Sequence, residues 1–194
     1  MPAKSKRSRD DLRIWLDADF VVEWGGRYER EVLDPTELYL LEETGPAIRV
    51  RGYALKHEFV AICKWKTNRT KGLIARNIPD EVREVTRLAF STNDDFLRVR
   101  VLQLLRGVGE PTASAVLTVW DPTQFTVVDF RVREAIQTLR LAPGRAESVE
   151  AALTDYVAYV RLCRRLAADC GSSLRQLDRA LWLWHRQSAA TRRS

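Results

Sequence analysis

The residues best placed to do chemistry together are two glycines in a turn and an aspartate that follows them. Residues 104–113, LLRGVGEPTA, lie between two amphipathic helical patterns and contain Gly107 and Gly109. Glycines at this spacing let the backbone adopt positive φ and turn its amide N–H groups outward, beside the positive end of the next helix dipole. Such a turn can bind a phosphate without reading a base. The alternative is an ordinary helical hairpin in which Gly107 is only a C-cap.

This turn and the residues after it resemble the helix-hairpin-helix (HhH-GPD) DNA glycosylase superfamily, in particular its endonuclease III-like members. In that family a hairpin of the form L-x-G-V-G-x-x-T-A is followed by an aspartate that opens a helix, and here VVDFRV, residues 127–132, supplies Asp129. The resemblance is specific over residues 101–139 and general elsewhere. It implies an all-α, two-lobed fold of about nine helices. It also implies base-excision repair of damaged or mispaired bases in double-stranded DNA, bound across a cleft with the base flipped out.

When the family's functional residues are matched to this sequence position by position, the resemblance implies a phosphate-binding turn and a catalytic carboxylate. The phosphate-binding turn would be Gly107, Val108, Gly109 and Thr112, and the catalytic carboxylate would be Asp129. Cleaving a base from its sugar builds positive charge on the sugar. An ionised carboxylate can stabilise that state and orient or deprotonate the attacking water. An aspartate just before a helix is also a common N-cap, worth about 1 kcal/mol, and both roles can hold at once.

The chain departs from the family pattern in two places. Bifunctional members carry a nucleophilic lysine two residues after the second glycine, where this chain has Pro111. The resemblance therefore implies a monofunctional enzyme that uses water and has no AP lyase activity of its own. Cys163 and Cys170 have the first spacing of the family's iron–sulfur site, but no cysteine follows them, and such a cluster needs four thiolates. We expect no cofactor and no metal, and interpret these two and Cys63 as small buried apolar residues.

A basic segment, residues 63–77 (CKWKTNRTKGLIARN), interrupts an acidic part of the chain and contains no acid. We expect Lys66 and Arg69 to contact phosphate. A base inside a duplex is unreachable, so it must be flipped out and the gap filled. Candidates for the base pocket or the wedge that fills the gap are Trp65, Asn68 and Phe130. The alternatives are a core tryptophan with solvated lysines around it, and a phenylalanine that is merely the first packed residue of its helix.

Composition narrows the class of protein. The chain has 194 residues, of which 45% are hydrophobic and 30% charged, so it is globular rather than disordered. The net charge of +6 favours a polyanionic partner, and residues 161–194 alone hold eight arginines against two aspartates. No apolar stretch approaches the ~18 residues of a membrane span. Three cysteines suit a reducing compartment. We expect a cytoplasmic monomer, nucleoid-associated when bound to DNA.

Hydrophobic periodicity predicts the elements that must position these residues. Residues 11–32 are weakly helical, with a break at Gly25-Gly26. Asp34 is a plausible N-cap for a helix that ends near residues 44–46. Further helices are expected over residues 55–65, from 79, 94–105, 110–120, 129–141, 146–169 and 173–187, with short extended segments at 48–51 and 125–128.

The resemblance also implies a division of the chain. Residues 11–54 and 142–194 would form one lobe, and residues 55–141 a central lobe with the hairpin at 104–113. From their own charge we expect residues 1–10 to be a flexible basic tail. Three functions remain open: a monofunctional glycosylase, a non-catalytic helix-hairpin-helix module that recognises distorted duplex, and a helical interaction protein with an incidental basic surface. Binding that weakens steeply with salt separates the first two from the third.

Overall fold

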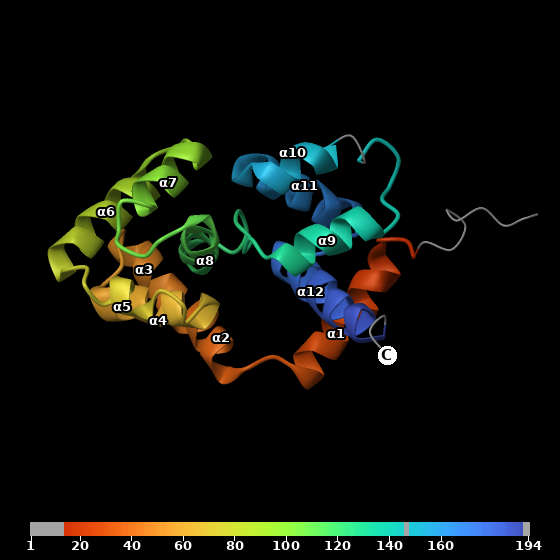
Figure 1. Ribbon diagram of the computed structural model, residues 1–194, viewed down its shortest axis with the longest axis horizontal. Coiled ribbons are helices and arrows are strands. Elements are labelled where there is room, and N and C mark those ends of the chain that lie inside the picture. The colour runs from red at the N-terminus through yellow and green to blue at the C-terminus, as the bar shows by residue number, and fades with distance from the viewer. Residues whose placement is uncertain (1–13, 146–147, 192–194) are drawn as a thin grey trace, which may run out of the picture.

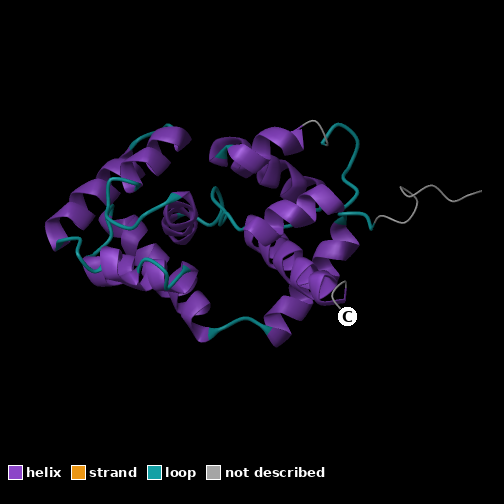
Figure 2. Ribbon diagram, in the orientation of Figure 1, coloured by secondary structure: helices purple, strands orange, loops and turns teal. Residues whose placement is uncertain are grey.

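The protein is all-α over the residues that its computed structural model describes, 14–145 and 148–191 (Figures 1 and 2). Nine of the helices there have seven residues or more. No strand forms in this part of the chain; one isolated bridge joins Trp15 to Arg140. The expected all-α class is confirmed. The expected basic tail, residues 1–10, lies outside the described residues.

One group of helices contains both ends of the described chain, at the right of Figure 1. Its members are α1 (Ala18–Glu31), α9 (Phe130–Thr138), α10 (Val149–Thr154), α11 (Tyr156–Asp169) and α12 (Leu174–Thr191). Helix α12 packs against α1, α9 and α11. The centroids of the Phe20 and Trp184 rings are 6.1 Å apart and the rings pack edge to face, so that aromatic packing joins α1 to α12.

The second group surrounds α8, at the left of Figure 1. Its members are α2 (Pro35–Tyr39), the π-helix η2 (Leu40–Thr44), α3 (Gly45–Arg51), α4 (Lys56–Lys66), α5 (Lys71–Ile74), α6 (Pro79–Ser91), α7 (Asp95–Leu102) and α8 (Glu110–Trp120). Helix α8 is buried from Thr112 to Val119 and packs against α3, α4 and α7. Although η2 and α3 belong to the range assigned above to the lobe of the chain ends, η2 packs on α4 and α8, and α3 packs on α8.

Aspartate caps begin several helices where the sequence predicted them. The Asp34 carboxylate accepts a hydrogen bond from the Glu37 amide at 2.9 Å, and Asp94 accepts one from the Leu97 amide at 2.9 Å. Asp129 caps α9 in the same way. Each cap satisfies a backbone N–H that has no partner within the helix, so the expected beginnings of α2, α7 and α9 are confirmed.

The expectations for residues 44–51 are wrong. The helix that begins at Pro35 does not end near Pro46. It continues from α2 through η2 into α3, so residues 48–51 are helical rather than extended. Proline fits the first turn of a helix because its missing N–H has no helical partner there. Helix α3 crosses α8 closely at Gly45, where a Cβ would lie 2.2 Å from the Val119 carbonyl oxygen. Ile48 is buried there while Val50 points to solvent.

Two other expectations about helix boundaries are wrong. Helix α1 runs through Gly25-Gly26, and Gly25 is buried. The single helix expected over residues 146–169 is divided by Asp155, whose carboxylate accepts a hydrogen bond from the Ala158 amide at 2.7 Å and caps α11. Residues 125–128 lie between helices, as expected, and form no strand within the described chain.

Candidate functional site

Asp129 stands at the N-terminus of α9, at the edge of a pocket. Its Oδ1 atom accepts a hydrogen bond from the Arg131 amide at 3.0 Å, which is the helix cap. Its Oδ2 atom lies 3.1 Å from the Lys66 ammonium, and the Arg131 guanidinium is 3.7 Å from Oδ1. The side chain of Asp129 is 18% exposed. The carboxylate is therefore fixed by the backbone and by a cation, yet it remains in contact with open space.

The extended segment before Asp129 is held by side chains from two neighbouring helices. Ser114 of α8 accepts a hydrogen bond from the Val128 amide at 2.9 Å through its hydroxyl. The Tyr159 hydroxyl of α11 donates to the Val127 carbonyl at 3.1 Å. These bonds replace the ladder that a strand partner would supply, and they fix where α9 begins.

Lys66, the last residue of α4, makes two contacts at this site. Its ammonium donates to the Val128 carbonyl at 2.8 Å as well as to the Asp129 carboxylate. The side chain is 14% exposed. The sequence predicted Lys66 as a phosphate contact; here it pairs with the candidate carboxylate, and one of its three N–H donors is left for a ligand.

The pocket beside Asp129 has a volume of about 330 Å³, within the range of roughly 300–1,000 Å³ typical of small-molecule sites. Helices α1, α4, α9 and α12 contribute to it. Its lining residues are Tyr28, Val32, Asp34, Trp65, Lys66, Val127, Asp129, Arg131, Arg175, Asp178, Arg179 and Trp182. Aromatic rings and charged groups of both signs thus face the same space.

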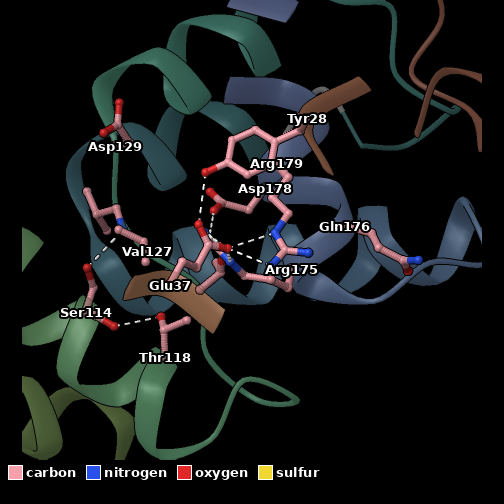
Figure 3. Close-up of polar contacts among 12 residues, drawn as sticks. Tyr28, Glu37, Ser114, Thr118, Val127, Asp129, Arg175, Gln176, Asp178 and Arg179 are labelled. Carbon is pink, nitrogen blue, oxygen red and sulfur yellow. Dashed lines mark hydrogen bonds and ion pairs between the residues drawn. The ribbon is translucent and has the colours of Figure 1, made fainter. Parts of the chain in front are cut away.

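One wall of the pocket is a buried network of charges that joins α2 to α12 (Figure 3). Glu37 is 1% exposed and lies 2.8 Å from the Arg175 guanidinium and 2.7 Å from that of Arg179. The Tyr28 hydroxyl donates to it at 3.0 Å. Burial works to raise the pKa of Glu37, but attraction to the two arginines and their hydrogen bonds outweigh it, so this pKa lies below its ordinary value. Glu37 is therefore the anionic centre of the wall.

Asp178 is the second buried carboxylate of this wall. It is 7% exposed, pairs with Arg175, and has one oxygen, Oδ1, with no hydrogen-bond partner in the described structure. Burial raises the pKa of Asp178 to about 6, with Asp129 and Glu37 adding to the rise and Arg175 and Lys66 opposing it. The folded environment therefore disfavours the ionised form of Asp178 relative to water.

The raised pKa of Asp178 predicts a pH dependence of stability. Because the pKa of about 6 lies above the ordinary 3.8, the folded state retains a proton that the unfolded chain releases. Asp178 therefore contributes to the free energy of unfolding near pH 4, and this contribution is lost as the pH rises through 6. We expect the free energy of unfolding to fall by about 2 kcal/mol from pH 4 to pH 7 for this reason. We expect Asp178→Asn to lack this loss, as urea unfolding of both proteins across that range would measure. Parallel pH profiles for the two proteins would contradict the assignment.

The glycine turn lies between α7 and α8 and packs on α5. Gly107 has a φ of +82°, which L side chains rarely adopt, and a Cβ there would lie 2.9 Å from the Leu73 Cβ. Gly109 is exposed and is the N-cap of α8. The amides of Gly109 and Glu110 make no hydrogen bond to any described part of the chain. The turn therefore presents backbone donors at the N-terminus of an eleven-residue helix.

Asn77, which the sequence analysis did not single out, holds the turn in place. Its side-chain oxygen accepts from the Arg106 amide at 2.7 Å, and its side-chain nitrogen donates to the Arg106 and Ile74 carbonyls at 3.0 Å each. Asn77 is 1% exposed. A side-chain amide can bridge a backbone donor and acceptor in this way, and a lone asparagine at the end of a basic segment gave no signal of the role.

The N-termini of α8 and α9 lie side by side. The Glu110 carboxylate, in the first turn of α8, pairs with the Arg133 guanidinium of α9 at 3.1 Å. Ser114, which holds the segment before Asp129, lies five residues after Gly109, about 7 Å along the axis of α8. The acid beside the glycine turn is thus paired, and this ion pair and the Ser114 hydrogen bond link the first half of α8 to the start of α9.

The remaining predicted site residues lie in the pocket, at exposed positions outside it, or in the core. Trp65 lines the pocket, with the Arg175 guanidinium 5.4 Å from its ring centroid. Phe130 is 57% exposed next to Asp129, under the Arg131 guanidinium at 4.5 Å. Asn68 and Arg69 are exposed in the turn after α4, outside the pocket lining. Thr112 is buried in α8, and its amide donates to the Gly109 carbonyl at 3.0 Å.

The interpretation of the cysteines as buried residues is confirmed, since Cys63, Cys163 and Cys170 are all buried with free thiols. Burial raises the pKa of Cys63 and of Cys163 to about 12, and that of Cys170 to about 11. Across the described ranges no group of three or more potential metal ligands gathers. No described helix is both long and apolar enough to cross a membrane.

Several pocket residues could not be found in the sequence. Arg175 and Asp178 of the lining carry no motif, nor does Glu37, which pairs with Arg175, and Tyr28 belongs to a segment without clear periodicity. Two signals were available: the basic segment without acids, which contains Trp65 and Lys66, and the arginine-rich residues 161–194, which include Arg175 and Arg179. Comparison of the chain with family models, with curated proteins and with solved structures finds no match.

Proposed function

We propose that this protein binds double-stranded DNA and is a monofunctional DNA N-glycosylase that removes a damaged or mispaired base. The single observation that carries the proposal is the placement of Asp129. It borders a pocket at the N-terminus of α9, beside the N-terminus of α8 with its glycine turn. The likeness of residues 101–139 to helix-hairpin-helix glycosylases supports the same assignment. The two-lobed, HhH-GPD-like arrangement remains part of this proposal.

Asp129 would act on the sugar of a nucleotide whose base enters the pocket. Loss of the base develops positive charge at the anomeric carbon, which a carboxylate stabilises, and the same carboxylate can orient or deprotonate the attacking water. Because Asp129 caps α9 through Oδ1, its Oδ2 atom faces Lys66. Lys66 keeps the carboxylate in place, and its remaining N–H can hydrogen-bond to the substrate. Trp65, whose ring has one arginine beside it, supplies apolar surface for a base.

The turn over Gly107, Val108 and Gly109 would bind the DNA backbone. Its free amides and the dipole of α8 attract a phosphate. Val108 is buried beneath the turn and anchors it. Arg69, which is exposed, remains a phosphate contact in this proposal, whereas Thr112 supports the turn from within. Phe130 and Asn68 are the exposed candidates for the wedge.

The monofunctional assignment follows from the available nucleophiles. Pro111 occupies the position of the family lysine and offers none. The Lys66 amine lies in the pocket, but it is paired with Asp129 at 3.1 Å, and an ion-paired ammonium has no lone pair with which to attack a sugar. We therefore propose that water is the attacking group.

One observation favours a non-catalytic alternative. Asp129 already serves as a helix cap and as the partner of Lys66, so both of its oxygens have structural roles. A helix-hairpin-helix module that recognises distorted duplex would need no more than this. The alternative binds the same DNA but releases no base.

The experiment is a panel of duplexes, each with one damaged or mispaired base, incubated with the protein and then treated with alkali. We expect strand breaks after alkali on at least one duplex, and none without alkali. We also expect no borohydride-trapped protein–DNA adduct. Binding without release on every duplex would favour the non-catalytic alternative, and an adduct lost in Lys66→Ala would overturn the monofunctional assignment.

A further inference from the structure

A second concave surface lies in the other part of the molecule, between α3, α6 and the end of α8. It has a volume of about 670 Å³. We call it the arginine groove. It is lined by Arg49, Arg51, Gly52, Tyr53, Arg83, Arg87, Phe90, Ser91 and Trp120. Four of these nine residues are arginines and none is acidic, so the groove presents an excess of positive charge.

The guanidinium groups of the groove are held by rings and by backbone carbonyls. Arg51 and Arg87 lie against the Tyr53 ring, 5.2 Å and 5.9 Å from its centroid. Arg51 also donates to the Tyr53 carbonyl at 3.1 Å, and Arg49 donates to the Trp120 carbonyl. Guanidiniums oriented in advance lose less conformational entropy when they bind an anion.

Acidic residues outside the groove balance only part of this charge. Arg51 pairs with Glu58, and Arg87 pairs with Glu84 at 2.7 Å. Arg83 lies 3.2 Å from Glu84 and from Asp80. Three carboxylates therefore pair with three of the four arginines, and Arg49 pairs with no acid in the described chain. The side chains of Arg83 and Arg87 are 44% and 51% exposed, which leaves them open to a further partner.

The rings of the groove offer no free face to a nucleobase. Trp120 stacks on Phe90 with centroids 4.7 Å apart and planes at 7°, and the Arg98 guanidinium lies 4.8 Å from the Trp120 centroid. Two arginines border Tyr53. Proteins that hold single-stranded nucleic acid stack its bases on open aromatic faces, so the groove is suited to anionic groups and not to bases. Carboxylates match the guanidinium fork well.

The groove is also separated from the proposed DNA contact. Gly109 caps one end of α8 and Trp120 ends the other, so about 16 Å of helix lies between them. Tyr53, Phe90 and Trp120 also line the groove and supply its apolar surface. A ligand with both acidic and apolar side chains would match this surface, and it could bind while the glycine turn holds DNA.

We propose that the arginine groove binds an acidic segment of a partner protein. The carboxylates of this segment pair with Arg49, Arg83 and Arg87, and one of its apolar side chains packs beside Phe90. This proposal does not depend on the proposed glycosylase activity, since it uses none of the same residues.

The test is fluorescence anisotropy with a labelled synthetic peptide of aspartates and glutamates that ends in phenylalanine. We expect saturable binding that weakens with salt, and a loss of at least about tenfold in affinity in both Arg49→Ala and Arg87→Glu. Arg100→Glu, at an exposed arginine of α7 outside the groove, is the matched control and should bind as the wild type does. Asp129→Asn should also bind normally, which keeps this result separate from the glycosylase proposal. Urea unfolding of each variant establishes that it is folded.

Three results would overturn the proposal. The first is the absence of saturable peptide binding to the wild-type protein. The second is an equal loss of affinity in Arg100→Glu, which would mean diffuse attraction to net positive charge. The third is binding of undamaged duplex DNA that the two groove variants weaken and the peptide does not compete for, which would make the groove a contact for the nucleic-acid backbone instead.

Discussion

Asp129→Asn is expected to reduce base release by about 10²–10³-fold, because it removes the negative charge that stabilises the developing cation on the sugar. Asparagine is as good an N-cap as aspartate, so α9 should remain intact. The Lys66 ammonium keeps its bond to the Val128 carbonyl at 2.8 Å. We therefore expect DNA affinity and unfolding free energy to change little. Single-turnover release of the base, followed by alkali and gel electrophoresis, measures the effect.

Asp94→Asn is the matched control for this substitution. Asp94 is the N-cap of α7 and accepts a hydrogen bond from the Leu97 amide at 2.9 Å, whereas Asp129 accepts one from the Arg131 amide; Asp94 is not part of the pocket lining. The same chemical change there should leave base release at the wild-type rate. Release that survives Asp129→Asn unchanged would assign the chemistry to another carboxylate, and release lost equally in both variants would point to helix capping.

Glu37→Gln is expected to cost about 3–5 kcal/mol of unfolding free energy, because it breaks a buried ion network by removing one partner. The carboxylate is 1% exposed and accepts hydrogen bonds from Arg175, Arg179 and Tyr28. Without its charge, two buried guanidiniums share Asp178 and the half-exposed Glu29. Since Glu37 comes from α2 and the arginines from α12, the pocket wall should also loosen. Urea unfolding at pH 7 measures the loss.

Glu43→Gln provides the comparison. Glu43 is an exposed glutamate of η2, a few residues from Glu37, and the same change there should cost well under 1 kcal/mol. If the two variants unfolded within about 1 kcal/mol of each other, the network would contribute little to stability. Its role would then be limited to shaping the pocket.

Local sequence signals predicted the parts of the site that depend on local structure. An aspartate before an amphipathic pattern indicated the cap of α9, and glycines between two helical patterns indicated the turn at Gly107. Capping and positive φ are properties of a few neighbouring residues, so a single sequence can reveal them. Pro46 was misleading because proline is compatible with the first turn of a helix as well as with the end of one.

Contacts between distant residues could not be predicted in this way. Lys66 and Asp129 are 63 positions apart, and Glu37 and Arg175 are 138 apart. Which charges meet depends on how α4 and α12 pack, and that packing is decided by apolar side chains such as Leu177 and Ile62, which carry no information about charge pairing. The basic segment therefore indicated a cationic surface, whereas the fold turns Lys66 inward onto a carboxylate. The arginine groove likewise joins residues from three separate helices.

The most direct test compares the wild-type protein and Asp129→Asn on the same panel of lesion-bearing duplexes, with alkali and without. Our account predicts alkali-dependent strand breaks at one class of base with the wild-type protein, at least about 10²-fold slower in Asp129→Asn. It also predicts equal binding of that duplex by both proteins. Binding of the duplexes with no base released from any of them would contradict it.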